Sequence, residues 1–460
     1  MSNCIKISVF GLGKLGASMV AGFASRGFSV IGVDINPVAV RALNEGLPPV
    51  QETGLAELIR THRTNIRATP SPDEAVAESE ISFVIVPTPS DQRGAFSIEY
   101  AKHAFADIGK ALRKKTKYHT VVLTSTVLPG ATRHGLLPVL EKESGKTCGL
   151  DFGLCYNPEF IALGSVIRDF LNPDFYLLGQ FDERSGNALE AVHKQVSVNQ
   201  APVKRMSLEN AELAKISVNS FVTMKISFAN MLAEFCEKIP GGDVDVVSDA
   251  LGMDKRIGRK YLTGGLGFGG PCFPRDNVAL DFMGKVLEVD SALLRENDAY
   301  NRRLAGRLVE KIRPLIPSGA SVGVLGLAYK PHSHVVEESP GVSICQALAD
   351  QGFRVFAHDP MAIPSARGLL QYRVVLTEDL AEVLREVEVL IVATHDPLYR
   401  DLGKQPGFPG IKIRHVVDPW RILDQTSLPS RVSRFAFGRA NPEAKVQRHI
   451  QSLWKEGGRV

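Results

Sequence analysis

Residues 5–16 read IKISVFGLGKLG, a short apolar stretch followed at once by three glycines with the spacing GxGxxG. The stretch predicts a strand, and the spacing predicts a tight turn into a helix that runs to about Arg26. In such a unit Gly11 permits the turn, Gly13 lets a pyrophosphate approach the backbone, and Gly16 lets helix and strand pack closely. Because a helix N-terminus attracts anions, residues 5–16 predict a dinucleotide site rather than a bare strand–helix turn.

A second predicted strand, residues 28–33, ends at Asp34. Strand, glycines, helix, strand and acidic residue follow one another at the spacing of a dinucleotide-binding βαβ unit. A carboxylate at that strand end accepts hydrogen bonds from the adenosine ribose, which favours NAD. Arg41 lies near enough in the sequence to keep NADP as an alternative.

Three further apolar segments end in residues suited to a ligand site. They are 81–86 before Pro87-Thr88-Pro89, 120–123 before 124–130, and 152–156 before Asn157-Pro158-Glu159-Phe160. Ligands of a doubly wound sheet bind outside the carboxyl ends of its strands, so we expect Thr126 to face the reactive end of the cofactor. Ser125 is equally suited to capping the next helix. Glu159 is a candidate acid or base, although a glutamate at such a place is more often a cap or a surface charge.

The most distinctive chemistry lies in residues 267–276, GFGGPCFPRD, which follow Gly264 and Gly265. Glycines let backbone approach a ligand closely and offer N–H donors. If a helix begins near Pro274, Cys272 lies at its N-terminus, where the positive end of the helix favours a thiolate and makes the cysteine a candidate nucleophile. The alternative, a buried free cysteine beside a turn, is less favoured among so many glycines. Asp276 follows four residues later.

Residues 208–237 carry the apolar spacing of a long helix. Lys215 and Asn219 are four residues apart and share one face of it. The lysine is either a solvated charge, the usual case, or a buried cation aimed at a developing oxyanion, with Asn219 positioning a water or a sugar hydroxyl. A second helix is expected over 279–312, and long helices of this kind commonly link domains and form dimer interfaces.

Strand–helix alternation resumes after a boundary at 314–319. The segments expected are a strand ending in a loop over 321–330, a helix over 341–351, and strands over 354–357, 389–393 and 415–417. Because GxGxxG is missing there, this part is expected to bind something other than a dinucleotide, with the active site in the cleft between two α/β domains. The expected fold is α/β, with two doubly wound Rossmann-like domains joined by a central helical segment. The expected domains are 1–200, which binds NAD, 201–313, which is helical and dimerises, and 314–460, which binds the second ligand.

Composition agrees with an ordinary globular protein. The 460 residues are 44% hydrophobic and 23% charged, with a net charge of +4 and dispersed basic residues. That distribution gives no footprint for nucleic acid or an anionic membrane. No apolar run is long enough to span a bilayer, and no signal peptide precedes the first strand. The six cysteines show neither CxxC nor zinc spacing, so we expect no metal site and a reduced, cytoplasmic protein.

The motifs together resemble the nucleotide-sugar 6-dehydrogenase family, whose best-known members are UDP-glucose and GDP-mannose dehydrogenases. They occur in the family's order over nearly the whole chain: GLGKLG (11–16), PTP (87–89), STVLPG (125–130), NPEF (157–160), AELAKISVNSF (211–221), RIG (256–258), GFGGPCFPRD (267–276), GLAYK (326–330) and ESP (338–340). The resemblance implies a four-electron oxidation of a primary alcohol to a carboxylate, using two NAD molecules in turn. Cys272 would trap the aldehyde as a thiohemiacetal, and a second hydride transfer would give a thioester that water hydrolyses. GFGGPCFPRD is more similar to the UDP-glucose and GDP-mannose branch than to the branch acting on acetamido sugars, and oxidation of UDP-glucose to UDP-glucuronate is the leading hypothesis.

The resemblance also implies roles for single residues. The catalytic set is Cys272, Lys215, Asn219, Asp276, Glu159 and Thr126. The cofactor set is Gly11, Gly13, Lys14, Leu15, Gly16, Asp34, Pro87, Thr88, Ser125, Thr126 and Arg275. The nucleotide-sugar set is Glu159, Phe160, Lys215, Asn219, Arg256, Tyr261, Phe268, Gly269, Cys272, Phe273, Tyr329, Lys330 and Arg421. Lys215 and Asn219 would stabilise oxyanions, and Asp276 would assist proton transfer or hold the water. Arg256 would reach in from the neighbouring subunit of a homodimer, although on residue type alone Arg256 and Tyr261 suit a plain surface role equally.

The sequence departs from the family pattern at a few positions. Leu163 stands where the family has a second glutamate, and Glu337 stands where it has an arginine near the cofactor phosphates; His334, Val335 and Ala39 also differ. Alternatives are therefore the same chemistry on GDP-mannose, a TDP-sugar or a UDP-N-acetylhexosamine, or a nucleotide-sugar-binding regulator that has lost catalysis. The intact catalytic set argues against a regulator. A two-electron hydroxyacid-type dehydrogenase would share the first domain but would not need the cysteine.

Overall fold

The computed structural model describes residues 5–161, 164–405, 412–423, 428–440 and 454. Leu163, one of the departures from the family pattern, lies outside the described residues. The chain divides into two compact units, which we call unit 1 (Met1–Val218 and Phe282–Leu287) and unit 2 (Asn219–Asp281 and Glu288–Val460). Within the described ranges, no helix combines the length and apolar character needed to cross a bilayer.

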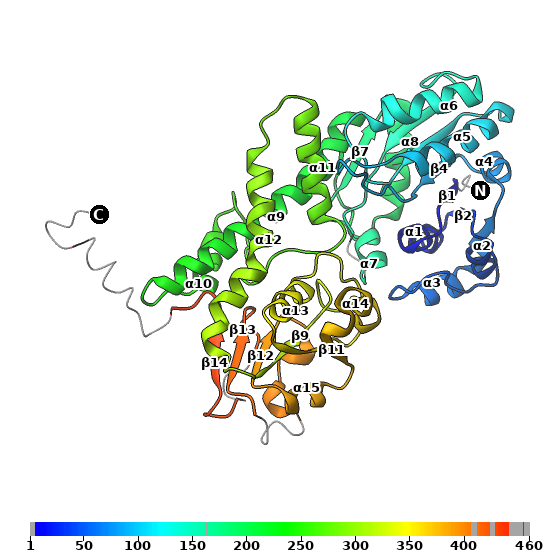
Figure 1. The fold of residues 1–460 in the computed structure, drawn as a ribbon. Coiled ribbons are helices and arrows are strands. Elements are labelled where there is room, and N and C mark those ends of the chain that lie inside the picture. Colours follow the sequence, from blue (N-terminus) through cyan, green and yellow to red (C-terminus); the bar gives the residue numbers. More distant parts are fainter. Residues whose placement is uncertain (1–4, 162–163, 406–411, 424–427, 441–453, 455–460) are drawn as a thin grey trace. The chain divides into compact units, whose positions relative to one another are not determined.

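Unit 1 is built on an eight-stranded sheet with the order β3-β2-β1-β4-β5-β6-β7-β8 (Figure 1). Its strands are β1 (Lys6–Phe10), β2 (Ser29–Val33), β3 (Ile66–Thr69), β4 (Ile81–Val84), β5 (His119–Leu123), β6 (Phe152–Tyr156), β7 (Tyr176–Gln180) and β8 (Val203–Ser207). Its helices are α1 (Lys14–Ser25), α2 (Pro37–Asn44), α3 (Leu55–Thr61), α4 (Pro72–Glu78), α5 (Glu99–Lys114), α6 (Leu137–Ser144), α7 (Val166–Leu171) and α8 (Glu183–Val196). Neighbouring strands are parallel except β6 and β7. The strand order reverses between β1 and β4, so the carboxyl ends of these two strands mark the point where a doubly wound sheet binds its ligand.

Both faces of this sheet are buried, which is what its near-continuous apolar strands predict. Val9 packs into one core cluster, whereas its neighbour Phe10 packs into the other. Successive strand residues point to opposite faces, so one cluster lies on each side. The first cluster includes Met19 of α1, and the second includes Phe105 of α5. The predicted βαβ unit and the predicted fold class are confirmed.

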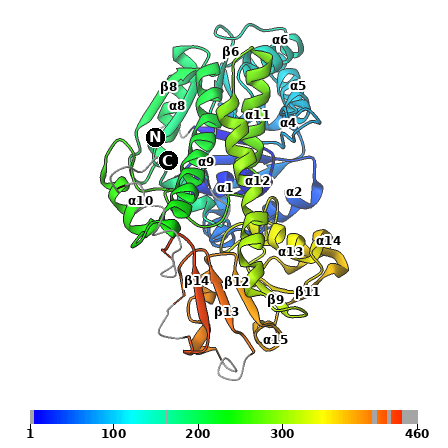
Figure 2. The same cartoon turned by 60° about the vertical axis from the view of Figure 1, so that its left-hand side comes forward.

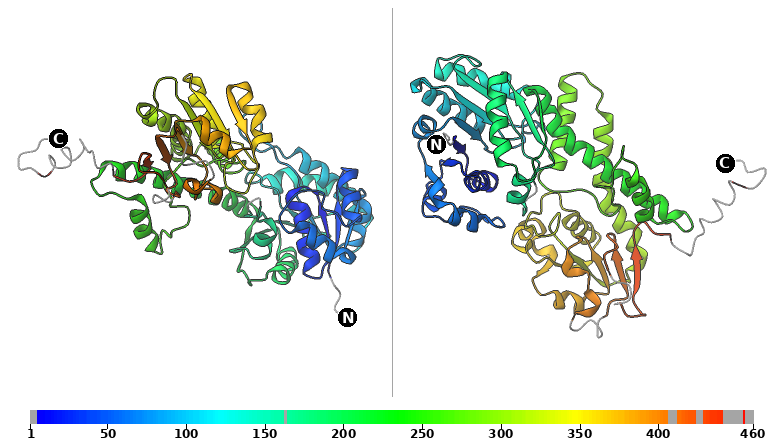
Figure 3. Two further views of the ribbon diagram at one scale, coloured as in Figure 1. Left: turned by 90° about the horizontal axis from the view of Figure 1, so that it is seen from below. Right: turned by 180° about the vertical axis from the view of Figure 1, so that it is seen from behind.

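Unit 2 contains a six-stranded parallel sheet with the order β11-β10-β9-β12-β13-β14. The strands are β9 (Ser321–Leu325), β10 (Arg354–His358), β11 (Val374–Thr377), β12 (Val389–Val392), β13 (His415–Asp418) and β14 (Ser433–Ala436). Figure 2 shows β9, β12, β13 and β14 side by side, and Figure 3 shows the same sheet from two other directions. The helices are α10 (Val244–Met253), α12 (Ala292–Ile312), α13 (Pro340–Asp350), α14 (Ile363–Leu370) and α15 (Leu380–Glu386).

Two more helices are shared between the units: α9 (Leu208–Lys238) and α11 (Phe273–Val286). The predicted helix over 208–237 is confirmed. The single helix predicted over 279–312 is wrong, because α11 ends at Val286 and α12 begins at Ala292. Between them Glu288 has φ +56°, a left-handed conformation that no α-helix accommodates. Asp290 then accepts the N–H of Ala292 at 3.0 Å and so satisfies a donor at the start of α12.

Candidate functional site

The start of α1 forms the cradle that the glycine spacing predicts. Gly11 has φ +100° and donates its N–H to the Val33 carbonyl at 2.8 Å, so the chain turns sharply after β1. A Cβ on Gly16 would lie 1.8 Å from the Gly11 carbonyl oxygen, whereas a Cβ on Gly13 would meet no atom within 4 Å. The turn before α1 therefore opens onto free space at a helix N-terminus, where a pyrophosphate fits.

Asp34 is oriented by the backbone of the same cradle. One carboxylate oxygen accepts the N–H of Leu12 at 2.6 Å, and the other accepts the N–H of Asn36 at 2.8 Å. Each oxygen keeps a second lone pair for a ribose hydroxyl. Arg41, the basis of the NADP alternative, lies exposed in the last turn of α2. The residues here that would hold NAD are Gly11, Gly13, Lys14, Leu15, Gly16 and Asp34.

The loops after β4 and β5 are tied together by two hydroxyl groups. Ser125 Oγ accepts the N–H of Val86 at 2.9 Å and donates to the Val86 carbonyl at 2.6 Å. Thr88 donates to the Thr126 carbonyl at 2.7 Å. The sequence left Ser125 open between a helix cap and a ligand contact, and the structure gives it a bridging role that neither reading included. Thr126 stays half-buried and Pro87 exposed at the loop tips.

Lys215, at the start of α9, lies against the loop that follows β6. Its Nζ donates to the Glu159 backbone carbonyl at 2.5 Å and lies 4.3 Å from the centre of the Phe160 ring. Lys215 is buried, so of the two readings of this lysine the structure excludes the solvated surface charge. Burial raises the pKa of the Glu159 carboxyl to about 8, although the nearby Lys215 charge opposes the rise. Among the described residues, Glu159 Oε1 is buried without a hydrogen-bond partner.

Glu212, a fully buried carboxylate three residues before Lys215, was not among the predicted site residues. Its two oxygens accept the N–H groups of Gly130 at 2.6 Å and Thr132 at 2.8 Å. This side chain fastens the first turns of α9 to the loop that carries Thr126. A glutamate on the apolar side of a predicted helix was the available signal, because a buried carboxylate needs such donors.

His193 of α8 was also missed. Its Nε2 lies 2.7 Å from Asn157 Oδ1, and Asn157 Nδ2 donates to the Leu177 carbonyl at 3.2 Å. Burial lowers the pKa of His193 to about 3, so the ring is neutral and donates through Nε2 to the amide oxygen. The hydrogen bond between His193 and Asn157 fixes the start of the segment that carries Glu159.

In unit 2, Cys272 is exposed immediately before α11, which begins at Phe273, so the condition for a cysteine at a helix N-terminus is met. Its carbonyl accepts the N–H of Asp276 at 2.9 Å, the first bond of the helix. The buried Asp276 carboxylate accepts a hydrogen bond from Asn219 Nδ2 at 2.6 Å. Arg275 Nε lies 3.9 Å from the other Asp276 oxygen. Three residues of the predicted catalytic set thus lie together at a helix N-terminus, where negative charge is favoured.

Aromatic and charged residues surround the cysteine within unit 2. Burial raises the pKa of Tyr329 to about 12, and Cys272, Glu337 and Tyr261 add to the rise when they are ionised. Lys330 Nζ lies 5.7 Å from the centre of the Tyr329 ring. Tyr261 is half exposed and has φ +67°, a strained conformation for a residue with a side chain.

Many backbone groups of the glycine-rich loop (264–270) are hydrogen-bonded or closely packed within the protein itself. Phe268 is buried, and both its N–H and its carbonyl bond to the Asn301 side chain. The N–H groups of Gly265 and Gly270 are also bonded within the protein. A Cβ on Gly269 would lie 2.2 Å from a backbone carbonyl oxygen. At Gly265 and Gly270 the expectation of N–H donors offered to a ligand is wrong, because these groups bond within the protein, and close packing accounts for the glycine at 269.

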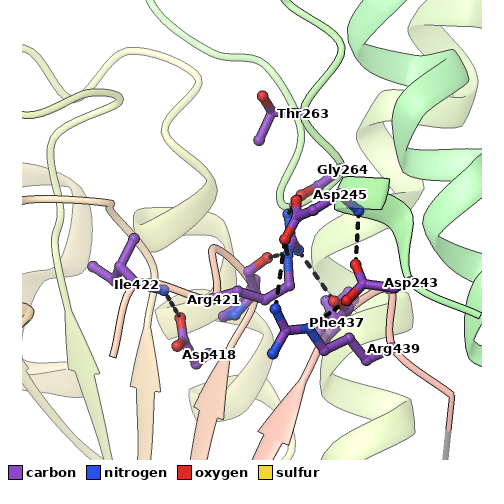
Figure 4. A network of polar contacts seen from close by, with 12 residues as sticks. Asp243, Asp245, Thr263, Gly264, Asp418, Arg421, Ile422, Phe437 and Arg439 are labelled. Carbon is purple, nitrogen blue, oxygen red and sulfur yellow. Dashed lines mark hydrogen bonds and ion pairs between the residues drawn. The ribbon is translucent and has the colours of Figure 1, made fainter. Parts of the chain in front are cut away.

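Arg421 has no N–H left for a ligand (Figure 4). Nε and Nη2 bond to the two Asp245 carboxylate oxygens at 2.7 and 2.8 Å. Nη1 donates to the Pro419 and Phe437 carbonyls at 2.7 and 3.1 Å, and Nη2 also donates to the Gly264 carbonyl at 2.7 Å. The side chain is only 2% exposed. All five guanidinium donors are therefore used inside unit 2.

Arg256 has the opposite character. Its side chain is 88% exposed and is paired bidentately with Asp254, at 3.0 Å through Nε and 2.6 Å through Nη2. An exposed, preoriented guanidinium of this kind remains accessible to a ligand or to another subunit.

A dinucleotide cradle with an acidic residue at the second strand, followed by a cysteine at a helix N-terminus, defines an NAD-dependent oxidoreductase. Three family descriptions match consecutive parts of the chain: the NAD binding domain of the UDP-glucose/GDP-mannose dehydrogenase family at residues 5–197, its central domain at 209–303, and its UDP binding domain at 323–425. The chain belongs to this family, its cofactor is NAD, and its substrate is a nucleotide-sugar.

Relatives with different substrates are equally similar to this chain. It is 33% identical over 428 residues to the GDP-mannose 6-dehydrogenase of Azotobacter vinelandii, covering 87% of this chain and 94% of the relative. It is also 33% identical over 423 residues to the UDP-glucose 6-dehydrogenase of Haloferax volcanii, covering 91% and 97%. The solved structure of a UDP-glucose dehydrogenase from Pyrobaculum islandicum matches with a TM-score of 0.83 and 36% identity, over 96% of this chain and 99% of that one.

Proposed function

We propose that this nucleotide-sugar dehydrogenase oxidises the C6 hydroxymethyl of UDP-glucose to the carboxylate of UDP-glucuronate, with Cys272 as the nucleophile. The observation that carries the proposal is the exposed Cys272 at the start of α11, with Asp276 held by Asn219 one turn further on. A dehydrogenase that stops at the aldehyde has no use for such a thiol. Bound NAD supplies the hydride acceptor for each of the two oxidations.

The residues of the site have separate proposed roles in the reaction. The Cys272 thiolate is favoured by the helix N-terminus, and it holds the reacting carbon covalently until water releases the acid. Lys215 is held between the Glu159 carbonyl and the Phe160 ring, and its ammonium group donates to the oxyanion that develops at that carbon. Glu159 has a pKa of about 8, so it can take a proton from the attacking water near neutral pH.

We also propose that two copies of the chain form the working enzyme. An apolar pocket of about 590 Å³ lies on unit 2. Its lining includes Phe221, Met224, Phe228, Met231, Leu251 and Leu293. Phe221 and Leu293 are 65% and 69% exposed, an unusual amount of apolar surface for a monomer. A second copy of the chain would cover this face and bring its own exposed Arg256 to the nucleotide-sugar bound by the first copy. Sedimentation velocity of the full chain tests whether the dimer forms.

The yield of NADH per nucleotide-sugar tests the reaction. With a limiting amount of sugar and excess NAD, a four-electron oxidation gives two NADH, a two-electron oxidation gives one, and a binding protein gives none. The panel is UDP-glucose, GDP-mannose, a TDP-hexose and a UDP-N-acetylhexosamine, because relatives of more than one specificity are equally similar. A single NADH from the best substrate would contradict the proposal.

Replacement of the nucleophile tests the mechanism. We expect Cys272→Ser to abolish acid formation while leaving the dissociation constants of NAD and of the nucleotide-sugar within about threefold of the wild type, since binding depends on the surrounding groups. Mass spectrometry of the product and calorimetry of binding measure the two effects. Normal turnover by the variant would remove Cys272 from the mechanism.

A further inference from the structure

The glycine-rich loop (264–270) leads directly into Cys272, and its shape is set by close contacts rather than by regular secondary structure. A Cβ on Gly265 would lie 2.8 Å from the Trp420 ring, and one on Gly267 would lie 2.4 Å from Asn301 Oδ1. Gly270 has φ +86°, and a Cβ there would lie 2.7 Å from the Tyr329 ring. The loop is therefore pressed against its surroundings along its whole length, which leaves its backbone polar groups in need of partners.

Two asparagine side chains supply most of those partners. Asn230 of α9 accepts the Gly265 N–H at 2.7 Å and donates to the Leu266 carbonyl at 3.2 Å. Asn301 of α12 accepts the Phe268 N–H at 2.8 Å and donates to the Phe268 carbonyl at 2.9 Å. Each amide thus satisfies one donor and one acceptor of the loop, which an ionised carboxylate, an acceptor only, cannot do.

Arg421 holds the first residue of the loop. Its Nη2 bonds both to the Gly264 carbonyl and to Asp245, whose backbone N–H in turn donates to Asp243 Oδ1 at 2.9 Å (Figure 4). At the far end, the Gly270 N–H donates to the Glu337 carbonyl at 2.8 Å. Side chains or backbone from four separate segments therefore hold the loop at Gly264, at 265–266, at Phe268 and at Gly270.

We propose that Asn230, Asn301 and Arg421 are positioning residues, which set the geometry of Cys272 by holding the backbone of the glycine-rich loop. All three hydrogen-bond to the backbone of the loop itself. Arg421 in particular acts on the loop and not on the nucleotide-sugar, because its donors are already used. This inference rests on the proposed role of Cys272, and displacement of a reacting group by about 1 Å is enough to cost about a hundredfold in rate.

The test is Asn301→Asp, with Arg303→Ala as the matched control on an exposed position of the same helix. The introduced carboxylate still accepts the Phe268 N–H, but it places a negative oxygen against the Phe268 carbonyl. We expect kcat at pH 8 to fall about tenfold or more with the KM for NAD unchanged, and amide exchange of peptides over 264–272 to quicken about tenfold. Arg303→Ala should leave both quantities at the wild-type values.

Lowering the pH gives a rescue within the same variant. A protonated carboxyl donates through its O–H to the Phe268 carbonyl, as the asparagine amide does. The ratio of kcat between Asn301→Asp and the wild type should therefore rise toward one once the pH is low enough to protonate the introduced carboxyl. If this variant does not fold, Asn230→Asp makes the same test from α9.

Two results would overturn the inference. One is unchanged kcat in both asparagine variants; the other is a fall in kcat matched by an equal loss of NAD affinity, which indicates general damage. If the wild type oxidises no nucleotide-sugar, the proposed function fails by itself. The rate of Cys272 alkylation by iodoacetamide, followed by mass spectrometry of its peptide, then replaces turnover, and a rate within twofold of the wild type in Asn301→Asp would overturn the inference.

Discussion

Replacing Glu159 by glutamine should make unit 1 more resistant to unfolding at alkaline pH. Burial raises the pKa of this carboxyl in the folded protein to about 8, from an ordinary value of 4.5. The folded state then holds the proton more tightly than the unfolded chain does. The stability that the neutral carboxyl contributes is complete below pH 4.5 and is lost as the pH rises through 8.

The size of the effect follows from the shift. A difference of 3.5 between the two pKa values corresponds to about 5 kcal/mol, at roughly 1.4 kcal/mol for each unit. About 3 kcal/mol of this is lost between pH 5.5 and pH 8.5. Glutamine has nearly the same shape as glutamate and stays neutral, so the variant should keep this part of its unfolding free energy over the whole pH range.

Hydrogen exchange measures this loss within unit 1 alone. Peptides from β1 and β5 report the unfolding free energy of that sheet at pH 5.5, 6.5, 7.5 and 8.5, after correction for the intrinsic exchange rates. Glu183→Gln, which alters an exposed carboxyl at the start of α8, is the matched control and should follow the wild type. Parallel curves for the wild type and Glu159→Gln over the whole range would refute the reasoning.

Three other substitutions test separate parts of the structure. Asp34→Ala should weaken NAD binding about tenfold or more by calorimetry, because the ribose loses its acceptor; unchanged affinity would contradict the assigned cradle. Arg421→Met should destabilise unit 2 by about 3 kcal/mol in urea, followed by Trp420 fluorescence, whereas a rise in KM without loss of stability would mean that the arginine binds substrate after all. Gly270→Ala should lower kcat, since its Cβ would meet the Tyr329 ring at 2.7 Å. Gly306→Ala, in an open helical position, should leave kcat unchanged and the protein as stable or slightly more stable. Equal effects of the two substitutions would count against the packing argument.

Local sequence signals were sufficient for the elements with strong periodicity. The turn at Gly11 and the long helix α9 both follow from residues close together in the chain, whereas a helix start near Pro274 was considered only as a condition. The break between α11 and α12 did not follow, because the apolar pattern continues through 287–291 and nothing local reveals the left-handed conformation of Glu288. Patterns that persist across a break make helix ends the least predictable feature of a fold.

Site residues were predictable where the residue type alone indicates the chemistry. They were unpredictable where the role of a residue depends on a partner far away in the sequence. Asp276 and Asn219 are 57 positions apart, and only the family resemblance brought them together in advance. Glu212 bonds to Gly130 across 82 positions, and no motif linked the two. Arg421 resembled a ligand residue by type and place, but five acceptors from four residues consume its donors. From sequence alone, a charged residue such as Arg421 is easily taken for a ligand-binding residue, because its pairing partners within the protein are visible only in the structure.

The stretch after β14 has a consequence for how the chain is made. Gly438 donates to Glu237 at 3.0 Å and accepts from Val244 at 2.8 Å, and the Ala440 N–H donates to the Gly242 carbonyl at 2.9 Å. These bonds join the turn between α9 and α10 to residues that a ribosome adds about two hundred positions later. Unit 2 can complete its fold only after residues 438–440 have been synthesised, so a stop codon before position 437 should leave the segment between α9 and α10 without these partners and incompletely folded.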